Sequence, residues 1–541
     1  MASNQKTNAD QGSQKSNPYN NYQDVKLQDP DAGHYDYIIV GAGSAGCVVT
    51  RRLIDGSDAK ILLVEAGGNN AGIASLINPL QWPENKGSQY DYAYTYEPTP
   101  FANDKIIPLP RGKVIGGSGS INVMVWARGN KYDYDKWAAA GNKGWDYKSV
   151  LPLFKKIEDW EDGETDFHGA GGPLRVERAP KHKIGEVMIA SARSYGIPFI
   201  DDVNAPSPEG VGYGIMNVKD GKRNGPATAY LEPVLHDKKL TVLTEAKVLK
   251  LNLEGKRCVG LSFIQNGKIY TVTAGKEVIL SAGAIDSPRI LMLSGIGDRA
   301  QLEKVGIETL IDLPGVGKNL QDHLILEGLI FEANEPLTPY SGNYLGNTLF
   351  WKSNPALQAA DLMVYACQVP VAMPQIAEKY APFPENAFSI LPALVNIKSK
   401  GGYIKLKNAA HDGPLEIEGK LASDPQDIEA LVNAVKLCMD LASQPAFKGL
   451  IKNWIAPAKY LTDREEILDF IKDALDTYIH PVGTCKMGSG PECVVNDQLL
   501  VHGVRGLRVV DASIMPVITS SNTQAPTFMI AEFAANLILA Q

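Results

Sequence analysis

The stretch YDYIIVGAGSAGCVVTRRLIDGSDAKILLVEAGG, residues 35–68, decides the fold of this chain. It begins with the β-branched run YIIV, passes through a glycine-rich turn into a helix-like segment, and ends in a second apolar run, ILLVEA. Runs of these kinds in this order predict a strand, a helix and a second strand parallel to the first. The sequence therefore predicts one βαβ unit and an α/β fold.

The turn inside this unit carries a G-x-G-x-x-G pattern. Gly41 allows a tight turn, Gly43 lets the backbone approach a pyrophosphate, and Gly46 lets helix and strand pack closely. Glu65 ends the next apolar run about 20 residues later, where it can accept hydrogen bonds from an unphosphorylated adenosine ribose. The helix N-terminus favours the phosphate charge. The pattern predicts a dinucleotide site and leaves FAD and NAD both open.

The bulk composition describes an ordinary globular protein. With 541 residues, 44% of them hydrophobic and 21% charged, the chain is long enough for two domains. A net charge of −8 argues against a nucleic-acid partner. The six cysteines show no paired or metal-ligand spacing, so we expect reduced, mostly buried thiols of an intracellular protein and no metal site.

The N-terminal segment differs from the rest of the chain. Residues 1–33 are polar and rich in Asn, Gln, Lys and Asp, with no apolar core segment. They predict a disordered leader and not a secretory signal. No apolar run reaches the roughly 18 residues that a membrane span needs. A cytoplasmic location is the default expectation.

Further patterns predict the elements that follow. Residues 110–129 form a second glycine-rich stretch of the kind that presses backbone against a flat or charged ligand. Residues 276–297 predict a buried strand and then a helix that starts near Pro288. The runs 240–254 and 257–264 alternate like half-exposed strands, and 425–444 predicts a helix.

Four blocks in order resemble the glucose–methanol–choline (GMC) oxidoreductases, a family of FAD-dependent alcohol oxidases and dehydrogenases. The blocks are the fingerprint at 41–65, GKVIGGSGSIN at 112–122, GAIDSPRILMLSGIG at 283–297, and HPVGTCKMG, VVDASIMP and SNTQAPTFMIAE within 480–532. The resemblance runs from about residue 35 to residue 541 and so covers everything except the leader.

The resemblance implies an α/β fold (α+β overall) with a Rossmann-like FAD-binding domain and a substrate domain built on an antiparallel sheet. Both domains are discontinuous in sequence. The FAD-binding domain is expected at 34–155, 230–320 and 495–541, and the substrate-binding domain at 156–229 and 321–494.

The resemblance also implies which residues bind FAD. Val248 falls where the backbone clasps the adenine, Asn122 lies against the isoalloxazine, and Asp511 sits near the pyrophosphate and ribityl chain. The full expected set is Gly41, Gly43, Ser44, Ala45, Gly46, Glu65, Ala66, Arg111, Val114, Gly116, Gly117, Asn122, Val125, Val248, Asp511, Ala512, Asn522 and Thr523.

Two features of these blocks bear on the flavin itself. Some family members bind the flavin covalently through a histidine, but the corresponding position here is Ile121, so dissociable FAD is expected. A helix with Pro526 in its first turn would place its positive end near the reduced flavin.

The histidine in YIHPVGTC (478–485) is the candidate base. A lone histidine in an apolar stretch is more often structural, yet the family places its catalytic pair on His480 and Asn522. We expect His480 to act as general base and Asn522 to hold the alcohol oxygen by a hydrogen bond, although Asn522 could instead hold a loop. For His323 we expect a structural role, and for His168 a surface or turn position.

The expected partners are a small-molecule alcohol and an electron acceptor, which is O2 or another oxidant. The apolar, aromatic stretch 361–397 leans toward a primary alcohol with an aromatic, furanic or aliphatic body, unless these residues only pack the core. The alternatives are a dehydrogenase for choline-like or polyol substrates and a cyanohydrin (hydroxynitrile) lyase that uses FAD structurally.

Overall fold

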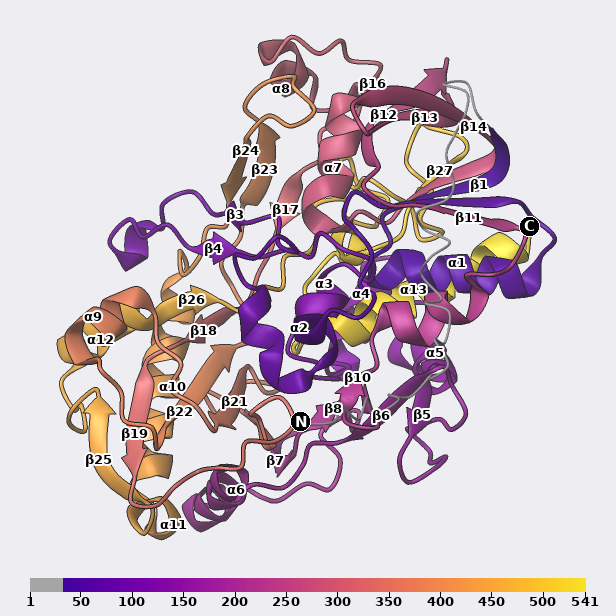
Figure 1. The fold of residues 1–541 in the computed structure, drawn as a ribbon. Coiled ribbons are helices and arrows are strands. Elements are labelled where there is room, and N and C mark those ends of the chain that lie inside the picture. Colours follow the sequence, from indigo (N-terminus) through magenta and orange to yellow (C-terminus); the bar gives the residue numbers. More distant parts are fainter. Residues whose placement is uncertain (1–32) are drawn as a thin grey trace, which may run out of the picture.

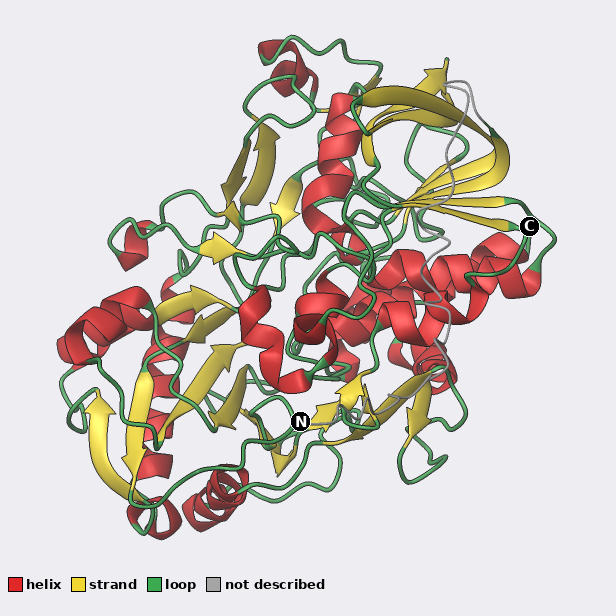
Figure 2. Ribbon diagram, in the orientation of Figure 1, coloured by secondary structure: helices red, strands yellow, loops and turns green. Residues whose placement is uncertain are grey.

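The computed structural model describes residues 33–541, so the predicted leader lies outside the described residues except for Gly33. Figure 1 shows two large sheets in separate parts of the molecule, and Figure 2 shows the helices that surround them. No helix within residues 33–541 is long and apolar enough to cross a membrane. All six cysteines lie in this part of the chain, buried and free of disulfides.

The first sheet carries the predicted βαβ unit. Its strands lie in the order β11-β2-β1-β14-β13-β12, with β27 also paired to β14. The strands are β1 (His34–Val40), β2 (Ile61–Val64), β11 (Leu240–Leu243), β12 (Lys247–Glu254), β13 (Arg257–Gln265), β14 (Lys268–Leu280) and β27 (Leu507–Val509). β1, β2, β11 and β27 run parallel to their neighbours. Burial on both faces explains why β2 reads as an unbroken apolar run.

Strand β14 joins two kinds of sheet. Residues 277–280 pair in parallel with β1, whereas residues 268–273 pair antiparallel with β13. One long strand therefore belongs to both the parallel dinucleotide half and the antiparallel β12–β13–β14 meander, which accounts for the half-exposed alternation at 247–265. The run predicted at 240–254 is divided, because residues 240–243 form β11 and pair in parallel with β2 at the opposite edge of the sheet.

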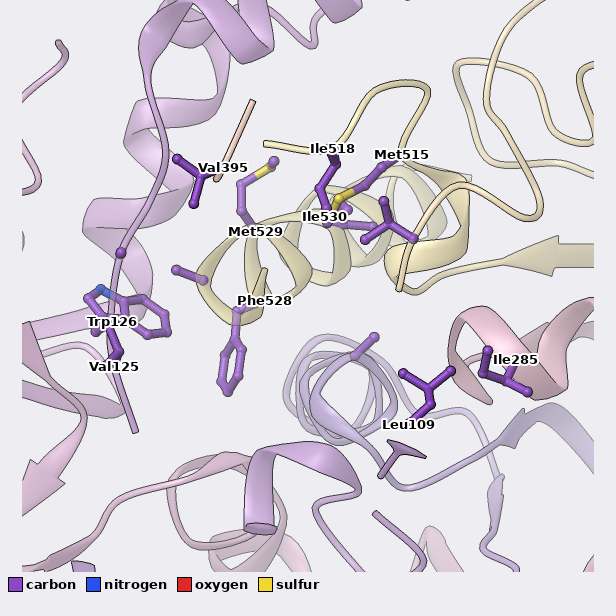
Figure 3. Packing of buried hydrophobic residues seen from close by; sticks show 14 of the residues in the cluster. Leu109, Val125, Trp126, Ile285, Val395, Met515, Ile518, Phe528, Met529 and Ile530 are labelled. Atoms are coloured by element: carbon purple, nitrogen blue, oxygen red, sulfur yellow. The ribbon is translucent and has the colours of Figure 1, made fainter. Parts of the chain in front are cut away.

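Two helices from opposite ends of the described chain pack together beneath this sheet. α1 (Ser44–Gly56) contacts α13 (Gln524–Leu539), and Figure 1 shows the two lying side by side. The buried Glu532 of α13 pairs with Arg52 of α1 at 2.7 Å. Figure 3 shows Phe528 on α13 with Trp126 nearby, and their rings meet edge to face at 5.6 Å.

The helix predicted to start near Pro288 begins earlier. α7 spans Gly283–Leu293 and contains Pro288 in its interior. A proline has no N–H, so it leaves the carbonyl four residues before it without a helical partner. The Thr484 hydroxyl fills this place by donating to the Ala284 carbonyl at 2.6 Å. A side chain from the distant 478–485 stretch thus allows the helix to start before its proline.

The second sheet is antiparallel, as predicted. Its strands lie in the order β25-β19-β22-β21-β20-β7, with β18 paired to both β22 and β26. They are β7 (Gly210–Tyr213), β18 (Leu324–Leu326), β19 (Leu329–Ala333), β20 (Asn347–Trp351), β21 (Leu362–Cys367), β22 (Ala387–Leu394), β25 (Ile451–Ala456) and β26 (Leu475–Thr477). α6 (Lys183–Tyr195) and α10 (Pro425–Ala442) pack on it. The helix predicted at 425–444 is therefore confirmed.

Shorter elements connect the two sheets. The other helices are α2 (Ala74–Ile77), α3 (Ser118–Ile121), α4 (Lys131–Ala139), α5 (Tyr147–Ile157), α8 (Arg299–Lys304), α9 (Pro374–Tyr380), α11 (Pro445–Lys448) and α12 (Arg464–Ala474). The other strands are β3 (Tyr94–Thr95), β4 (Pro108–Leu109), β5 (Glu158–Trp160), β6 (Leu174–Arg178), β8 (Ile215–Met216), β9 (Val218–Lys219), β10 (Lys222–Arg223), β15 (Ile296–Gly297), β16 (Ile311–Asp312), β17 (Lys318–Leu320), β23 (Gly402–Leu406) and β24 (Leu415–Glu418). The domain boundaries drawn above stay a prediction.

Candidate active site

A cavity of about 460 Å³ reaches from the first sheet to the second. At one end it is lined by Val40 and Val64, the last residues of the parallel strands β1 and β2. At the other end it is lined by Tyr365 and Cys367, which alternate along one face of β21. Ligands of open α/β sheets bind outside the carboxyl ends of the strands, so this position is the expected one.

The fingerprint glycines lie where the motif requires them. Gly41 has a φ of +94°, and a Cβ on it would lie 2.6 Å from the Ser281 carbonyl oxygen. A Cβ on Gly46 would lie 1.9 Å from the Gly41 carbonyl oxygen, so only glycine allows α1 to pack this closely. Gly43, Ser44 and Ala45 line the cavity at the start of α1. No side chain caps this helix, which leaves its first N–H groups available to a phosphate.

Glu65 is buried at the adjoining strand end and lines the cavity with Ala66. Its carboxylate accepts hydrogen bonds from the backbone N–H of Ala42 at 2.8 Å and of Gly67 at 2.7 Å. Burial raises its pKa to about 7, and the two hydrogen bonds oppose this effect. Each carboxylate oxygen keeps acceptor capacity for a ribose hydroxyl.

The second glycine-rich stretch touches the first. The Gly116 N–H donates to the Ala42 carbonyl at 2.7 Å, and a Cβ on Gly117 would lie 2.8 Å from the Cα of Gly43. Gly117, Arg111, Asn122, Val125 and Ile121 line the cavity. Close approach of two backbone loops at one cavity wall explains why both stretches are rich in glycine.

Three residues predicted to bind the cofactor lie behind the cavity lining instead of in it. They are Gly46, Val114 and Gly116; the other predicted residues all line the cavity. Gly46 packs α1 on the Gly41 turn, and Gly116 bonds to the Ala42 loop. Val114 is buried and pairs with Gly68. Their sequence pattern reflects packing of the two loops and not direct lining of the cavity.

Asp511 anchors the start of α7. Its carboxylate accepts hydrogen bonds from the Gly283 N–H at 2.9 Å, the Ser287 hydroxyl at 2.6 Å and the Ser513 N–H at 2.8 Å. Burial raises the pKa of Asp511, whereas these donors hold it down. Val248, Ala512 and Thr523 complete the predicted lining.

The predicted catalytic pair is in contact. The Asn522 Nδ2 atom lies 3.3 Å from Nε2 of His480, and the Tyr365 hydroxyl donates to Asn522 Oδ1 at 3.2 Å. Because Tyr365 occupies the oxygen of the amide, the NH2 group of Asn522 faces the imidazole. His480 Nε2 is then the acceptor and presents its lone pair, which is the state that a general base requires.

His323 is the residue whose role the sequence analysis missed. It is fully buried, and its Nδ1 atom lies 3.1 Å from Nδ1 of His480. Since His480 Nε2 accepts from Asn522, its Nδ1 carries the proton and donates to His323 Nδ1. The expected structural role therefore includes direct contact with His480, the predicted base. In the sequence, the indication was that His323 lies next to the expected boundary between the two domains.

Both histidines are held neutral. Burial lowers the pKa of His323 to about 3. Burial also lowers the pKa of His480 well below its ordinary value, and the nearby His323 and Arg111 lower it further. A neutral His480 needs no deprotonation before it can accept a proton near neutral pH.

The backbone around His480 is clamped on both sides. The His480 N–H donates to Asp322 Oδ1 at 2.6 Å, and the Arg111 guanidinium donates to the Ile479 carbonyl at 2.6 Å. Ile479 has a φ of +63°, an uncommon conformation for a β-branched residue. Asp322 in turn accepts from the Tyr96 hydroxyl at 2.7 Å. These contacts fix the direction of the imidazole.

The wall beyond the catalytic pair is mostly apolar. It is lined by Ile325, Leu345, Val371 and Leu391, together with Cys367 and Glu327. Burial and the neighbouring Asp476 raise the pKa of Glu327 to about 7, whereas Lys86 and Lys105 oppose this effect. Burial raises the pKa of the Cys367 thiol to about 12, and the charge of Glu327 adds to it.

His168 does not lie at the surface as predicted. It is buried, with Nδ1 2.8 Å from the Glu158 carboxylate and Nε2 3.2 Å from Asp202. Glu158 also pairs with Arg128. Buried charges are stable only when paired. The contacts to Glu158 and Asp202 therefore explain how this histidine can lie buried in a polar stretch of the chain.

The lining fits a dinucleotide such as FAD. An uncapped helix N-terminus, two glycine loops in contact and a carboxylate at the end of the second strand are the groups that a pyrophosphate and an adenosine ribose require. His480 and Asn522, the predicted catalytic pair, line the same cavity.

Comparison with known proteins agrees with this geometry. The N-terminal model of the GMC oxidoreductases matches residues 35–325, and the C-terminal model matches residues 398–531. The chain is 36% identical to mitochondrial choline dehydrogenase of Homo sapiens, over 94% of this chain and 90% of that protein. It is also 36% identical to alcohol dehydrogenase [acceptor] of Pseudomonas putida, over 93% of this chain and 96% of that protein.

A solved structure shows the same fold. Pyridoxine 4-oxidase from "Mesorbium loti" superposes with a TM-score of 0.88 at 31% identity, covering 93% of this chain and 98% of that one. The two family models and the relatives show that the chain belongs to the GMC oxidoreductase family and is an FAD-dependent alcohol oxidoreductase.

Proposed function

We propose that this enzyme oxidises a primary alcohol to an aldehyde, with His480 as general base and Asn522 as the hydrogen-bond donor to the alcohol oxygen. The observation that carries the proposal is the 3.3 Å contact between Asn522 Nδ2 and His480 Nε2 on the cavity wall. An alcohol oxygen within hydrogen-bond reach of both atoms takes the place of their mutual hydrogen bond, gives its proton to Nε2 and accepts a hydrogen bond from Nδ2.

The chain manages the proton and the orientation of the substrate. FAD, when bound, supplies the hydride acceptor that no side chain provides. His480 Nε2 takes the hydroxyl proton, and its Nδ1–H stays bonded to His323. Tyr365 holds the Asn522 amide so that its NH2 group points at the substrate oxygen.

The apolar wall supports an aromatic, furanic or aliphatic body for the alcohol. Ile325, Leu345, Val371 and Leu391 offer no hydrogen bonds from their side chains. A choline-like alcohol is the second candidate. Glu327 favours it, because this cavity-lining carboxylate attracts a cationic group in its ionised form, and several relatives are named choline dehydrogenase.

A panel of alcohols tests both candidates. The purified holoenzyme is mixed anaerobically with benzylic, furanic, aliphatic and choline-type alcohols, and flavin bleaching is followed. We expect bleaching by one of these classes, and admission of air then separates an oxidase from a dehydrogenase. Absence of bleaching with every alcohol would contradict the proposal and would favour the lyase alternative, in which the flavin stays oxidised.

His480→Ala tests the assignment of the base. We expect flavin reduction to slow by roughly a hundredfold or more, because a general base contributes 10²–10⁴-fold. The matched control is His502→Ala, which removes a histidine bonded to the Gly488 carbonyl away from the cavity lining. A near-normal rate in His480→Ala would exclude the proposed role.

FAD held without a covalent bond is also proposed, because Ile121 lines the cavity where an isoleucine can form no such link. Acid precipitation should release the yellow colour into the supernatant. Retention of the colour in the pellet would contradict the proposal.

A further inference from the structure

Arg223 is a buried cation with no acidic partner. It lies on β10 with 6% of its surface exposed. Its guanidinium donates only to neutral acceptors: the Leu76 carbonyl at 2.9 Å, the Gly119 carbonyl at 3.2 Å, Asn122 Oδ1 at 2.6 Å and the Asn122 carbonyl at 2.7 Å. No carboxylate in residues 33–541 forms an ion pair with it, whereas the buried Arg128 and Arg508 pair with Glu158 and Glu277.

The charge persists despite burial. Burial lowers the pKa of Arg223 to about 9, which is still above neutral pH. An unpaired buried charge is costly, and residues of this kind gather at functional sites. The four neutral acceptors satisfy its hydrogen bonds but leave its positive charge uncompensated.

The charge is directed at the reactive end of the cavity. Two of its bonding partners, Gly119 and Asn122, line the cavity, although Arg223 does not. Asn122 Nδ2 also donates to Gln524 Oε1 at 2.7 Å, and Gln524 follows two residues after the Asn522 that contacts His480. If the hydride leaves a carbon held at His480 and Asn522, its acceptor must lie within this part of the cavity.

We propose that Arg223 supplies an uncompensated positive charge that stabilises the reduced form of the bound flavin. Hydride transfer from the alcohol carbon brings two electrons and one proton to the flavin, so the ring system gains one negative charge. The hydroxyl proton stays on His480. This inference rests on the proposed function for the position of the flavin ring. Arg223 does not line the cavity, so it is not a catalytic residue; its charge acts across Gly119 and Asn122, which do line it.

The test is the midpoint potential of the flavin. Arg223→Gln removes the charge and keeps a hydrogen-bonding side chain, and Arg223→Lys keeps the charge. Lys222→Gln is the matched control, because it removes an exposed charge from the same two-residue strand. Each holoenzyme is reduced in equilibrium with a reference dye, without any alcohol, so the result does not depend on which substrate the enzyme uses.

We expect Arg223→Gln to lower the equilibrium ratio of reduced to oxidised flavin by roughly tenfold. This is the effect of removing a unit charge about 10 Å away at an effective dielectric constant of about 20. For a two-electron couple this is a fall of about 30 mV. Arg223→Lys and Lys222→Gln should stay within about threefold of the wild type. Raising the salt concentration should leave the difference unchanged, because a buried charge is little screened.

Three results would overturn the proposal. One is an unchanged potential in Arg223→Gln. Another is an equal shift in Arg223→Gln and Arg223→Lys, which would assign the effect to the hydrogen bonds of Asn122. The third is loss of oxidised FAD from the neutral variants Arg223→Gln and Arg223→Met, which would mean that the charge serves assembly of the site. Failure of the alcohol panel alone leaves these measurements valid, so the two proposals fail separately.

Discussion

The contact between His323 and His480 predicts that a buried residue outside the cavity lining controls the rate of oxidation. The change to make is His323→Leu. Leucine is apolar and similar in size to histidine, so it fits a fully buried position. It lacks the nitrogen that accepts the His480 Nδ1–H. A matched variant, His323→Asn, keeps an oxygen near the position of the lost Nδ1 acceptor.

The magnitude follows from one hydrogen bond. Proton transfer to Nε2 makes His480 an imidazolium, whose Nδ1–H then donates a charge-assisted hydrogen bond to His323 that is worth about 1.5–3 kcal/mol. The contact to Asn522 keeps the proton of neutral His480 on Nδ1 in the variant, so the loss falls on the imidazolium as it forms. A loss of about 1.4 kcal/mol from the transition state lowers a rate constant about tenfold. We therefore expect the rate constant of flavin reduction to fall about tenfold in His323→Leu.

The assay is anaerobic stopped-flow reduction of the flavin at a series of alcohol concentrations. The limiting rate constant should fall, whereas the dissociation constant of the alcohol should stay close to the wild-type value. His323→Asn should lose less than about threefold. A His323→Leu enzyme that is folded, loaded with flavin and within twofold of the wild-type rate would refute the argument from the His323–His480 hydrogen bond, as would equal losses in both variants.

Three further predictions concern assembly and stability. Gly46→Ala should lower the melting temperature of the apoprotein, because the new Cβ would lie 1.9 Å from the Gly41 carbonyl oxygen. Gly43→Ala should leave that temperature unchanged, because no atom would lie nearer than 4.0 Å to its Cβ, but it should weaken FAD binding in a fluorescence titration. In the folded protein the pKa of His323 is about 3, below its ordinary value of 6.5, so between these pH values His323 takes up a proton when the protein unfolds. The free energy of unfolding should therefore fall by about 1.4 kcal/mol per pH unit from pH 6.5 down to about pH 3. Urea titrations should show a shallower pH slope for His323→Asn, and equal slopes would contradict this linkage. Thr484→Val should cost about 1 kcal/mol of unfolding free energy, since it removes the donor to the Ala284 carbonyl, and an unchanged urea midpoint would show that this bond contributes nothing.

Local patterns in the sequence carried much of the fold. The apolar run of β2, the glycines at 41, 43 and 46, and the helix at 425–442 each follow from short-range rules of burial, turn geometry and periodicity. The start of α7 did not follow, because the partner that allows Pro288 inside the helix is Thr484, about 200 residues away.

The site divides in the same way. Sequence by itself determined that a dinucleotide site lies at the end of the first strand, and its motifs, through their resemblance to a family, predicted His480 and Asn522 as the reactive pair. Only the tertiary structure decided that His323 contacts His480, that Val114 and Gly116 lie behind the lining, and that Arg223 has no acidic partner within residues 33–541. These facts depend on which side chains meet across two sheets, and burial, charge pairing and tautomer arise only from that meeting.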